Sequence, residues 1–226
     1  MTTEVKQISN RIEVSITGPS IEDIENNELT IYSYSFTYFD ADKNEFIMSS
    51  DFETEIELDE FDFQQEIYNN LLEKNPQYAS INISLNYDWA NGSGNAEVFA
   101  IGYNISVITV EEWEELLKNK TIFNEETLKV LNRMKNFRTP IDSSTLSRNY
   151  GGSILMYGRV TGTLVEQITK IQNLNIEELT KPVAISYVFK KIKVDIQYND
   201  EYILTPNLSR ALDKIDLSNI KLYEDN

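Results

Sequence analysis

A ten-residue run in which aromatic and hydroxyl side chains alternate sets the fold class of this chain: Thr30-Ile31-Tyr32-Ser33-Tyr34-Ser35-Phe36-Thr37-Tyr38-Phe39. Successive side chains of a β-strand point to opposite faces of a sheet. Tyr32, Tyr34, Phe36 and Tyr38 therefore share one face, and the hydroxyl side chains between them share the other. This alternation predicts a strand with one buried side and one side that faces solvent.

A turn over residues 40–45 and a short returning strand over residues 46–49 lead into a second alternating run. Here carboxylates take the place of the hydroxyls: Asp51-Phe52-Glu53-Thr54-Glu55-Ile56-Glu57-Leu58-Asp59. Alternate carboxylates on one strand face stand roughly 7 Å apart, and neighbouring like charges lower stability. We therefore expect a basic strand, a cation or a basic protein to lie against this face, unless the charge serves only solubility.

Charge is distributed unevenly along the 226 residues, which carry a formal net charge of −17. Residues 1–120 contain 24 acidic and 6 basic side chains, whereas residues 121–226 contain 13 acidic and 14 basic ones. The acidic excess is densest between Asp40 and Glu66, where eleven carboxylates accompany the single Lys43. The partner-binding residues predicted from this charge are Asp51, Glu53, Glu55, Glu57, Asp59 and Asp62.

The rest of the chain mixes strand and helix patterns without a βαβ rhythm, which favours an α+β fold with mostly antiparallel sheet and several short helices packed on it. Further strands are predicted over residues 5–16, 78–89, 96–107, 154–160 and 182–198. Asp59 or Asp62 can cap a helix that runs to about residue 74, and Thr109 and Asn124 can cap two more. The last helices are predicted over residues 163–174 and 206–214.

The length fits one large domain or two small ones. Residues 138–153 are rich in Ser, Thr, Gly and Pro, so they are the best candidate for a linker or long loop. This predicts an acidic, β-rich domain over residues 1–137 and a smaller α+β subdomain over residues 154–226, with a single domain as the alternative.

The absence of cysteine and histidine excludes several chemistries. There can be no disulfide, thiolate nucleophile or Ser-His-Asp triad, and a zinc site is very hard to build. Carboxylates that hydrolyse glycosides or hold magnesium or calcium remain open. No catalytic motif occurs, so we expect no enzyme activity and no cofactor. No apolar run approaches a membrane span and no export signal is present, which predicts a cytoplasmic protein.

Two local clusters are candidate sites. Asp40, Asp42 and Asn44 resemble the start of a calcium-binding EF-hand loop, but Glu45 stands where that loop needs glycine, so a hairpin turn is favoured. The tight basic cluster is formed by Lys190, Lys191 and Lys193. Its simplest use is to face acidic groups of the same chain or of a neighbouring subunit. Direct binding to nucleic acid would need a much larger basic patch.

These features together predict a non-enzymatic, acidic inhibitor or immunity-type regulator that docks on a basic protein, with nucleic-acid mimicry as one form of it. A self-assembling structural subunit of the virion or tail type is the first alternative, and a carboxylate-based hydrolase with magnesium or calcium is the second. A phage or mobile-element origin would suit the two leading interpretations and would place the protein in the host cytoplasm.

Overall fold

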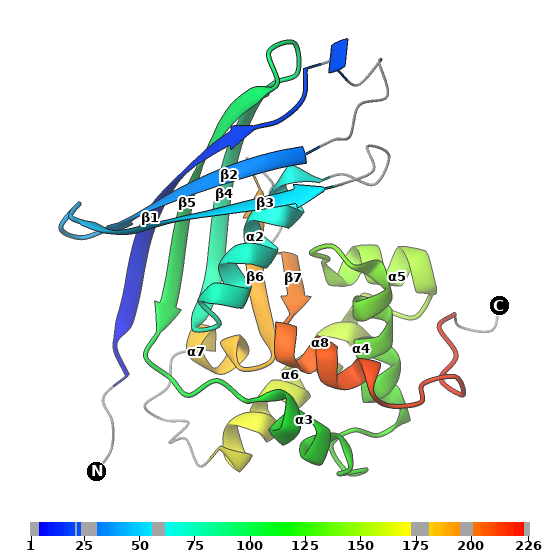
Figure 1. Ribbon diagram of the computed structural model, residues 1–226. Helices are drawn as coiled ribbons and strands as arrows, with labels where there is room; N and C mark the ends of the chain where they lie inside the picture. Colours follow the sequence, from blue (N-terminus) through cyan, green and yellow to red (C-terminus); the bar gives the residue numbers. More distant parts are fainter. Residues whose placement is uncertain are drawn as a thin grey trace.

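The computed structural model describes residues 5–20, 22–23, 31–55, 62–172, 181–194 and 201–223. These residues form a seven-stranded sheet with the strand order β3-β2-β1-β5-β4-β6-β7 (Figure 1). All neighbouring strands run antiparallel except β4 and β6, which are parallel. The strands are β1 (Gln7–Thr17), β2 (Ile31–Asp40), β3 (Phe46–Glu55), β4 (Tyr78–Asp88), β5 (Ser93–Tyr103), β6 (Phe189–Val194) and β7 (Glu201–Leu204). The predicted α+β class is confirmed.

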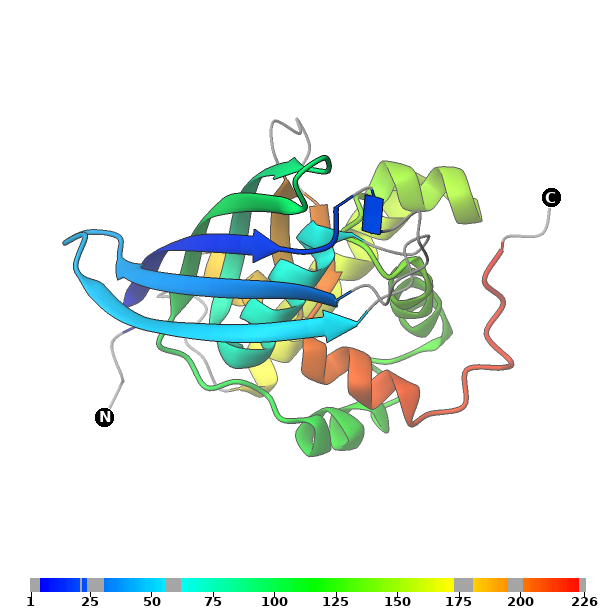
Figure 2. The ribbon, with the colours of Figure 1, turned by 45° about the horizontal axis from the view of Figure 1, so that its top comes forward.

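One face of this sheet packs on helix α2 (Phe63–Lys74) and forms the first hydrophobic cluster. Tyr32, Tyr34, Phe36 and Tyr38 are all buried there, as their alternation predicts. The strongly twisted sheet encloses α2 on this inner side (Figures 1 and 2). Asp62 is the N-cap of α2, and its carboxylate accepts hydrogen bonds from the backbone N–H groups of Gln64 and Gln65.

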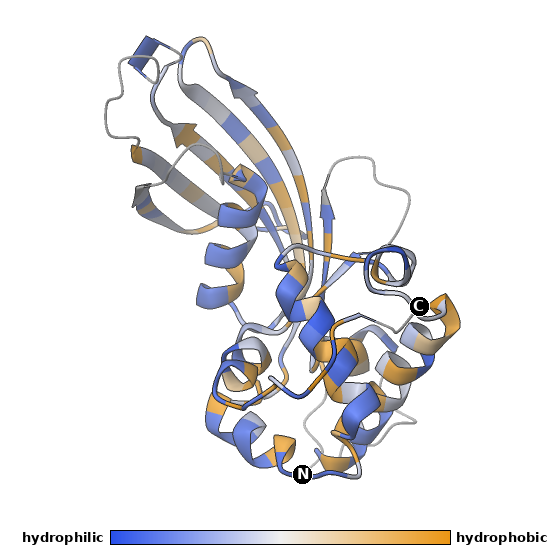
Figure 3. Ribbon diagram, turned by 90° about the vertical axis from the view of Figure 1, so that its right-hand side faces the viewer, coloured by the Kyte–Doolittle hydropathy of each residue, from blue (hydrophilic) through white to orange (hydrophobic). Residues whose placement is uncertain are grey.

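The remaining described helices gather below the sheet and form a second hydrophobic cluster (Figure 1). In Figure 3 apolar and polar segments alternate along these helices. Thr109 and Asn124 cap α3 and α4, as predicted. The helices are α3 (Val110–Leu117), α4 (Glu125–Phe137), α5 (Ser143–Tyr150), α6 (Ile154–Ile171), α7 (Lys181–Ser186) and α8 (Pro206–Asp213).

The strand predicted over residues 154–160 is wrong, because this segment begins the 18-residue helix α6. The Ser153 hydroxyl caps the helix, and its buried side chains recur every three or four residues, at Tyr157, Val160, Leu164 and Ile168. A short apolar run does not distinguish a strand from a buried helix. The strand predicted over residues 182–198 is also partly wrong, since helix α7 occupies its first residues and β6 begins only at Phe189.

The predicted linker is largely structured. Residues 143–150 form α5, and Ile141 pairs with Tyr202 of β7 through two backbone hydrogen bonds. Strands β6 and β7 belong to the predicted C-terminal subdomain, yet β6 pairs with β4 of the acidic part. Whether residues 1–137 and 154–226 fold independently stays a prediction.

Candidate functional site

The sheet face opposite α2, which we name the outer face, is open to solvent. It consists of the odd-numbered residues of β1, β2 and β5, the even-numbered residues of β4 from Ser80 onward, and Phe46, Ser49, Asp51 and Glu53 of β3. Most of these side chains are exposed, whereas the alternating residues on the inner side are buried. The outer face is therefore the broad surface on which the sheet can meet another molecule.

The β3 side of the outer face carries carboxylates beside hydroxyl groups. Asp51 lies opposite Ser35 and accepts a hydrogen bond from its hydroxyl at 2.5 Å. Glu53 lies opposite Ser33 and accepts a hydrogen bond from that hydroxyl at 3.2 Å. These bonds orient the two carboxylates on the strand surface, and both carboxylates remain exposed. Their charge is available to a partner because no ion pair within the described residues neutralises either group.

Two further carboxylates extend the acidic surface to the middle of the sheet. Glu13 of β1 lies directly opposite Glu97 of β5, and both are exposed. Like charges in direct cross-strand register are unfavourable. Arg11 relieves part of this repulsion, since its guanidinium forms an ion pair with Glu13. Pairing of β1 with β5 thus brings together charges that are 84 residues apart in sequence.

A row of aromatic side chains borders the carboxylates on the outer face. Phe46 pairs with Phe39, and Arg11 lies between Phe39 and Phe99 in the cross-strand register. The Arg11 guanidinium carbon lies 4.3 Å from the centre of the Phe39 ring. Phe46 is 63% exposed and Phe99 is 41% exposed. Aromatic and arginine side chains at the centre of a polar surface are typical of protein interfaces.

The predicted acidic residues do not all lie on this face. Asp51 and Glu53 do, and the backbone of Glu55 continues β3. Glu57 and Asp59 lie outside the described residues. Asp62 is exposed, but its carboxylate caps α2 on the other side of the sheet. Local sequence patterns do not mark Glu13, Glu97, Arg11 or Phe99, because only strand pairing makes them neighbours.

The weak calcium candidate forms the turn between β2 and β3. One Asp40 carboxylate oxygen accepts hydrogen bonds from the backbone N–H groups of Asp42 and Lys43. Asn44 has a φ of 55°, and its side-chain oxygen accepts a hydrogen bond from Arg11. The oxygens of Asp40 and Asn44 thus already stabilise the hairpin, as the favoured interpretation requires. The described part of the chain contains no group of three acidic side chains that could hold a metal ion.

The structure divides the predicted basic cluster between two faces of β6. Lys191 and Lys193 pair with residues of the outer face and are half-buried. Lys190 points the other way, is only 4% exposed, and donates a hydrogen bond from its ammonium to the Pro76 carbonyl at 2.8 Å. Burial lowers the pKa of Lys190 to about 7. Lys190 is therefore not available to a neighbouring subunit, and the exposed basic group reduces to Lys191 and Lys193.

No family model matches this chain, and no curated protein or solved structure matches it either. Within the described residues, no helix combines the length and the hydrophobicity that crossing a bilayer requires. What the molecule does is therefore inferred from its own surfaces.

Proposed function

We propose that the protein is a non-enzymatic binding protein that docks its outer face on a basic surface of another protein and thereby inhibits or regulates that partner. The observation that carries this proposal is the exposed group of Asp51, Glu53, Glu13 and Glu97 beside an exposed aromatic row. Carboxylates accelerate the encounter with a basic partner, and buried aromatic anchors supply most of the affinity.

The decisive comparison uses two variants with the same change in net charge. The face variant carries Asp51→Lys, Glu53→Lys and Glu97→Lys. The control variant carries Glu111→Lys, Glu115→Lys and Glu125→Lys, which lie on exposed positions of α3 and α4. Each tagged protein is used to capture partners from a lysate of the cells in which it is made, at low and at high salt, and captured proteins are identified by mass.

We expect wild type and the control variant to retain the same basic protein, and the face variant to lose it. Retention is expected to fall as salt rises, because screening weakens interactions between exposed charges. Equal capture by the face variant and the control variant would show that total charge, rather than the outer face, attracts the partner, and the proposal would fail.

A self-assembling subunit is the second candidate, and one observation favours it. Lys193 of β6 pairs with Asn82 of β4, so it lies on the outer face. Strand β6 is near one edge of the sheet, whereas β3, which carries Asp51 and Glu53, is the other edge. Two copies could therefore place the basic edge of one against the acidic side of the other. Light-scattering mass after size exclusion separates the candidates: a monomer at all concentrations contradicts assembly, whereas an oligomer that dissociates with salt supports it.

The predicted hydrolase has no comparable support. The carboxylates of the outer face lie on an open surface, and hydrolysis by paired carboxylates needs a substrate held between them. The experiment above also distinguishes this alternative, since a hydrolase has no reason to retain a basic protein through Asp51 and Glu53.

A further inference from the structure

A cavity of about 530 Å³ lies between the helices of the second cluster. Its walls come from α4, α5, α6 and α7, and strands β6 and β7 close one side. Small-molecule sites in proteins usually enclose roughly 300–1,000 Å³. The cavity is thus large enough for one small molecule, and it lies in a region separate from the outer face.

Two glycines of helix α6 line the cavity, and both are exposed to solvent. Gly158 and Gly162 lie four residues apart and therefore on one side of the helix. A Cβ atom added at either position would meet nothing within 4 Å. Neither glycine has a positive φ, and a glycine inside a helix costs roughly 0.5–1 kcal/mol relative to alanine. Backbone geometry and close packing therefore do not explain them, whereas the open space above them does.

The lining of the cavity is predominantly apolar. Met134, Leu146, Val165 and Phe189 contribute to it. The two threonines that line the cavity add little polarity, because the hydroxyl of Thr161 donates to the Tyr157 carbonyl and that of Thr169 donates to the Val165 carbonyl. Hydroxyls that are satisfied within their own helix leave methyl groups to contact an occupant. An apolar molecule can therefore enter without stripping water from unpaired polar groups.

The charged groups at the cavity differ in whether another of the described residues matches their charge. The Asp142 carboxylate accepts hydrogen bonds from the Thr145 backbone N–H and the Ser144 hydroxyl. Glu166 forms an ion pair with Lys170 at 2.6 Å. Lys181 also lines the cavity and is exposed, and it has no ion pair with any of the described residues. An anionic group on the occupant would therefore find its counter-charge at Lys181.

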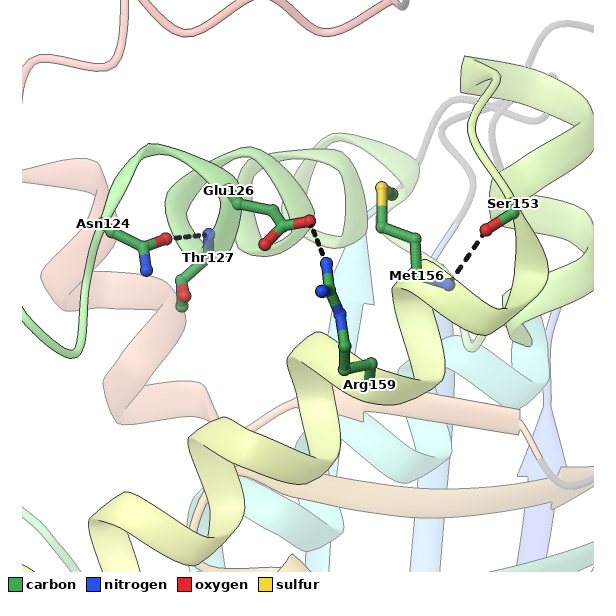
Figure 4. Close-up of polar contacts among 6 residues, drawn as sticks. All are labelled: Asn124, Glu126, Thr127, Ser153, Met156 and Arg159. Carbon is green, nitrogen blue, oxygen red and sulfur yellow. Dashed lines mark hydrogen bonds and ion pairs between the residues drawn. The ribbon is translucent and has the colours of Figure 1, made fainter.

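Contacts outside the cavity lining connect and cap two of the helices that form its walls. Arg159 of α6 forms an ion pair with Glu126 of α4 at 2.6 Å, and Ser153 caps the start of α6 (Figure 4). Asn124 caps α4 in the same view by accepting a hydrogen bond from the Thr127 backbone N–H. The ion pair joins two of the helices that line the cavity, and each cap stabilises the start of its own helix. None of these side chains lines the cavity.

We infer that this cavity is a binding site for a small apolar molecule that carries one anionic group, such as a carboxylate or sulfonate. The apolar body lies over Gly158 and Gly162, and the anionic group lies beside Lys181. This site goes beyond the proposed docking function, since it uses none of the residues of the outer face.

The test measures binding of the fluorescent probe anilinonaphthalene sulfonate to the purified full-length protein. The double variant Gly158→Leu and Gly162→Leu fills the cavity, and Thr163→Leu on an exposed position of the same helix is the matched control. We expect wild type and Thr163→Leu to bind one probe molecule per chain, and the double variant to bind about tenfold more weakly or not at all. Equal binding by the double variant and wild type would overturn the site.

A loss of binding must not come from unfolding, so each variant is melted while its circular dichroism is followed. Leucine favours helix over glycine, and the double variant is expected to melt at or above the temperature of wild type. If the double variant melts lower, Gly162→Leu alone is used, and it must still weaken binding.

The anionic group has a separate readout. Lys181→Glu is expected to weaken binding of anilinonaphthalene sulfonate several-fold and to leave binding of the uncharged dye Nile red unchanged. Equal affinity of wild type and Lys181→Glu for the sulfonate would overturn the assignment of an anionic ligand.

Discussion

The sheet region and the helical region each bury one hydrophobic cluster, but they leave different surfaces outside it. The sheet has two faces and only one layer of helix, so its second face stays open and carries carboxylates. The helices pack on several sides of one another and leave a concave space instead, which is apolar. A broad charged face suits a macromolecular partner, whereas a concave apolar pocket suits a small molecule.

The two regions also bury their cations differently. Arg133 in the helical cluster is fully buried, donates to the Tyr157 hydroxyl and the Leu222 carbonyl, and lies near the rings of Tyr150 and Tyr157. Lys190, which lies where the sheet meets the helices, donates a hydrogen bond to the Pro76 carbonyl. Burial with few partners favours the neutral form of an ammonium group, in agreement with the lowered pKa of Lys190.

The largest expected change in stability comes from core substitutions, which also test whether the two clusters unfold as one unit. Ile67→Ala removes a fully buried side chain of the sheet cluster, and Leu164→Ala removes one of the helical cluster. Each is expected to lower the free energy of unfolding by about 2–5 kcal/mol. Because β6 contributes Ile192 to one cluster and Phe189 to the other, we expect both variants to shift one common urea transition.

The two tryptophans make this measurement specific to each region. Trp89 contacts Phe63 and Tyr87 in the sheet region, and Trp113 contacts Phe123 in the helical region. Trp113→Phe leaves fluorescence that reports on the sheet, and Trp89→Phe leaves fluorescence that reports on the helices. Two separate midpoints would contradict the single unit and would support the domain division at residues 138–153.

The next largest effect is the pH dependence of stability that the buried Lys190, between the two regions, is expected to cause. The pKa of Lys190 is lowered by burial from 10.5 to about 7, so between these pH values the unfolded chain binds more protons than the folded one. Stability therefore rises with pH in this window, by about 2 kcal/mol between pH 7 and pH 9. Urea unfolding of wild type is compared with Lys190→Met, in which this gain is absent. Parallel pH profiles of the two proteins would show that Lys190 titrates normally.

The smallest effect concerns the open face of the sheet. Glu97→Gln removes the repulsion between Glu97 and Glu13 and is expected to raise the free energy of unfolding by roughly 0.2–1 kcal/mol at low salt. The gain should shrink at high salt because exposed charges are screened. Glu111→Gln on α3 is the matched control and is expected to change stability less. If Glu97→Gln does not raise the free energy of unfolding at low salt, Arg11 already offsets the repulsion between Glu13 and Glu97.

The sequence alone determined those features that depend on neighbours within a few residues. Alternation predicted the buried row from Tyr32 to Tyr38, because a strand turns each successive side chain to the other face. Hydrogen-bonding side chains at Asp62, Thr109 and Asn124 predicted three helix starts, because the first N–H groups of a helix need local acceptors.

Only the tertiary structure decided which distant segments meet. Residues 154–160 are helical because Tyr157 and Val160 pack into the helical cluster and not against the edge of the sheet. Pairing of β1 with β5 set Glu13 against Glu97, and pairing of β6 with β4 buried Lys190 while it turned Lys193 to the outer face. Strand order and register depend on contacts across many residues, and one residue of slip would reverse every side chain. The outer face and the cavity are products of those long-range contacts, which no local pattern encodes.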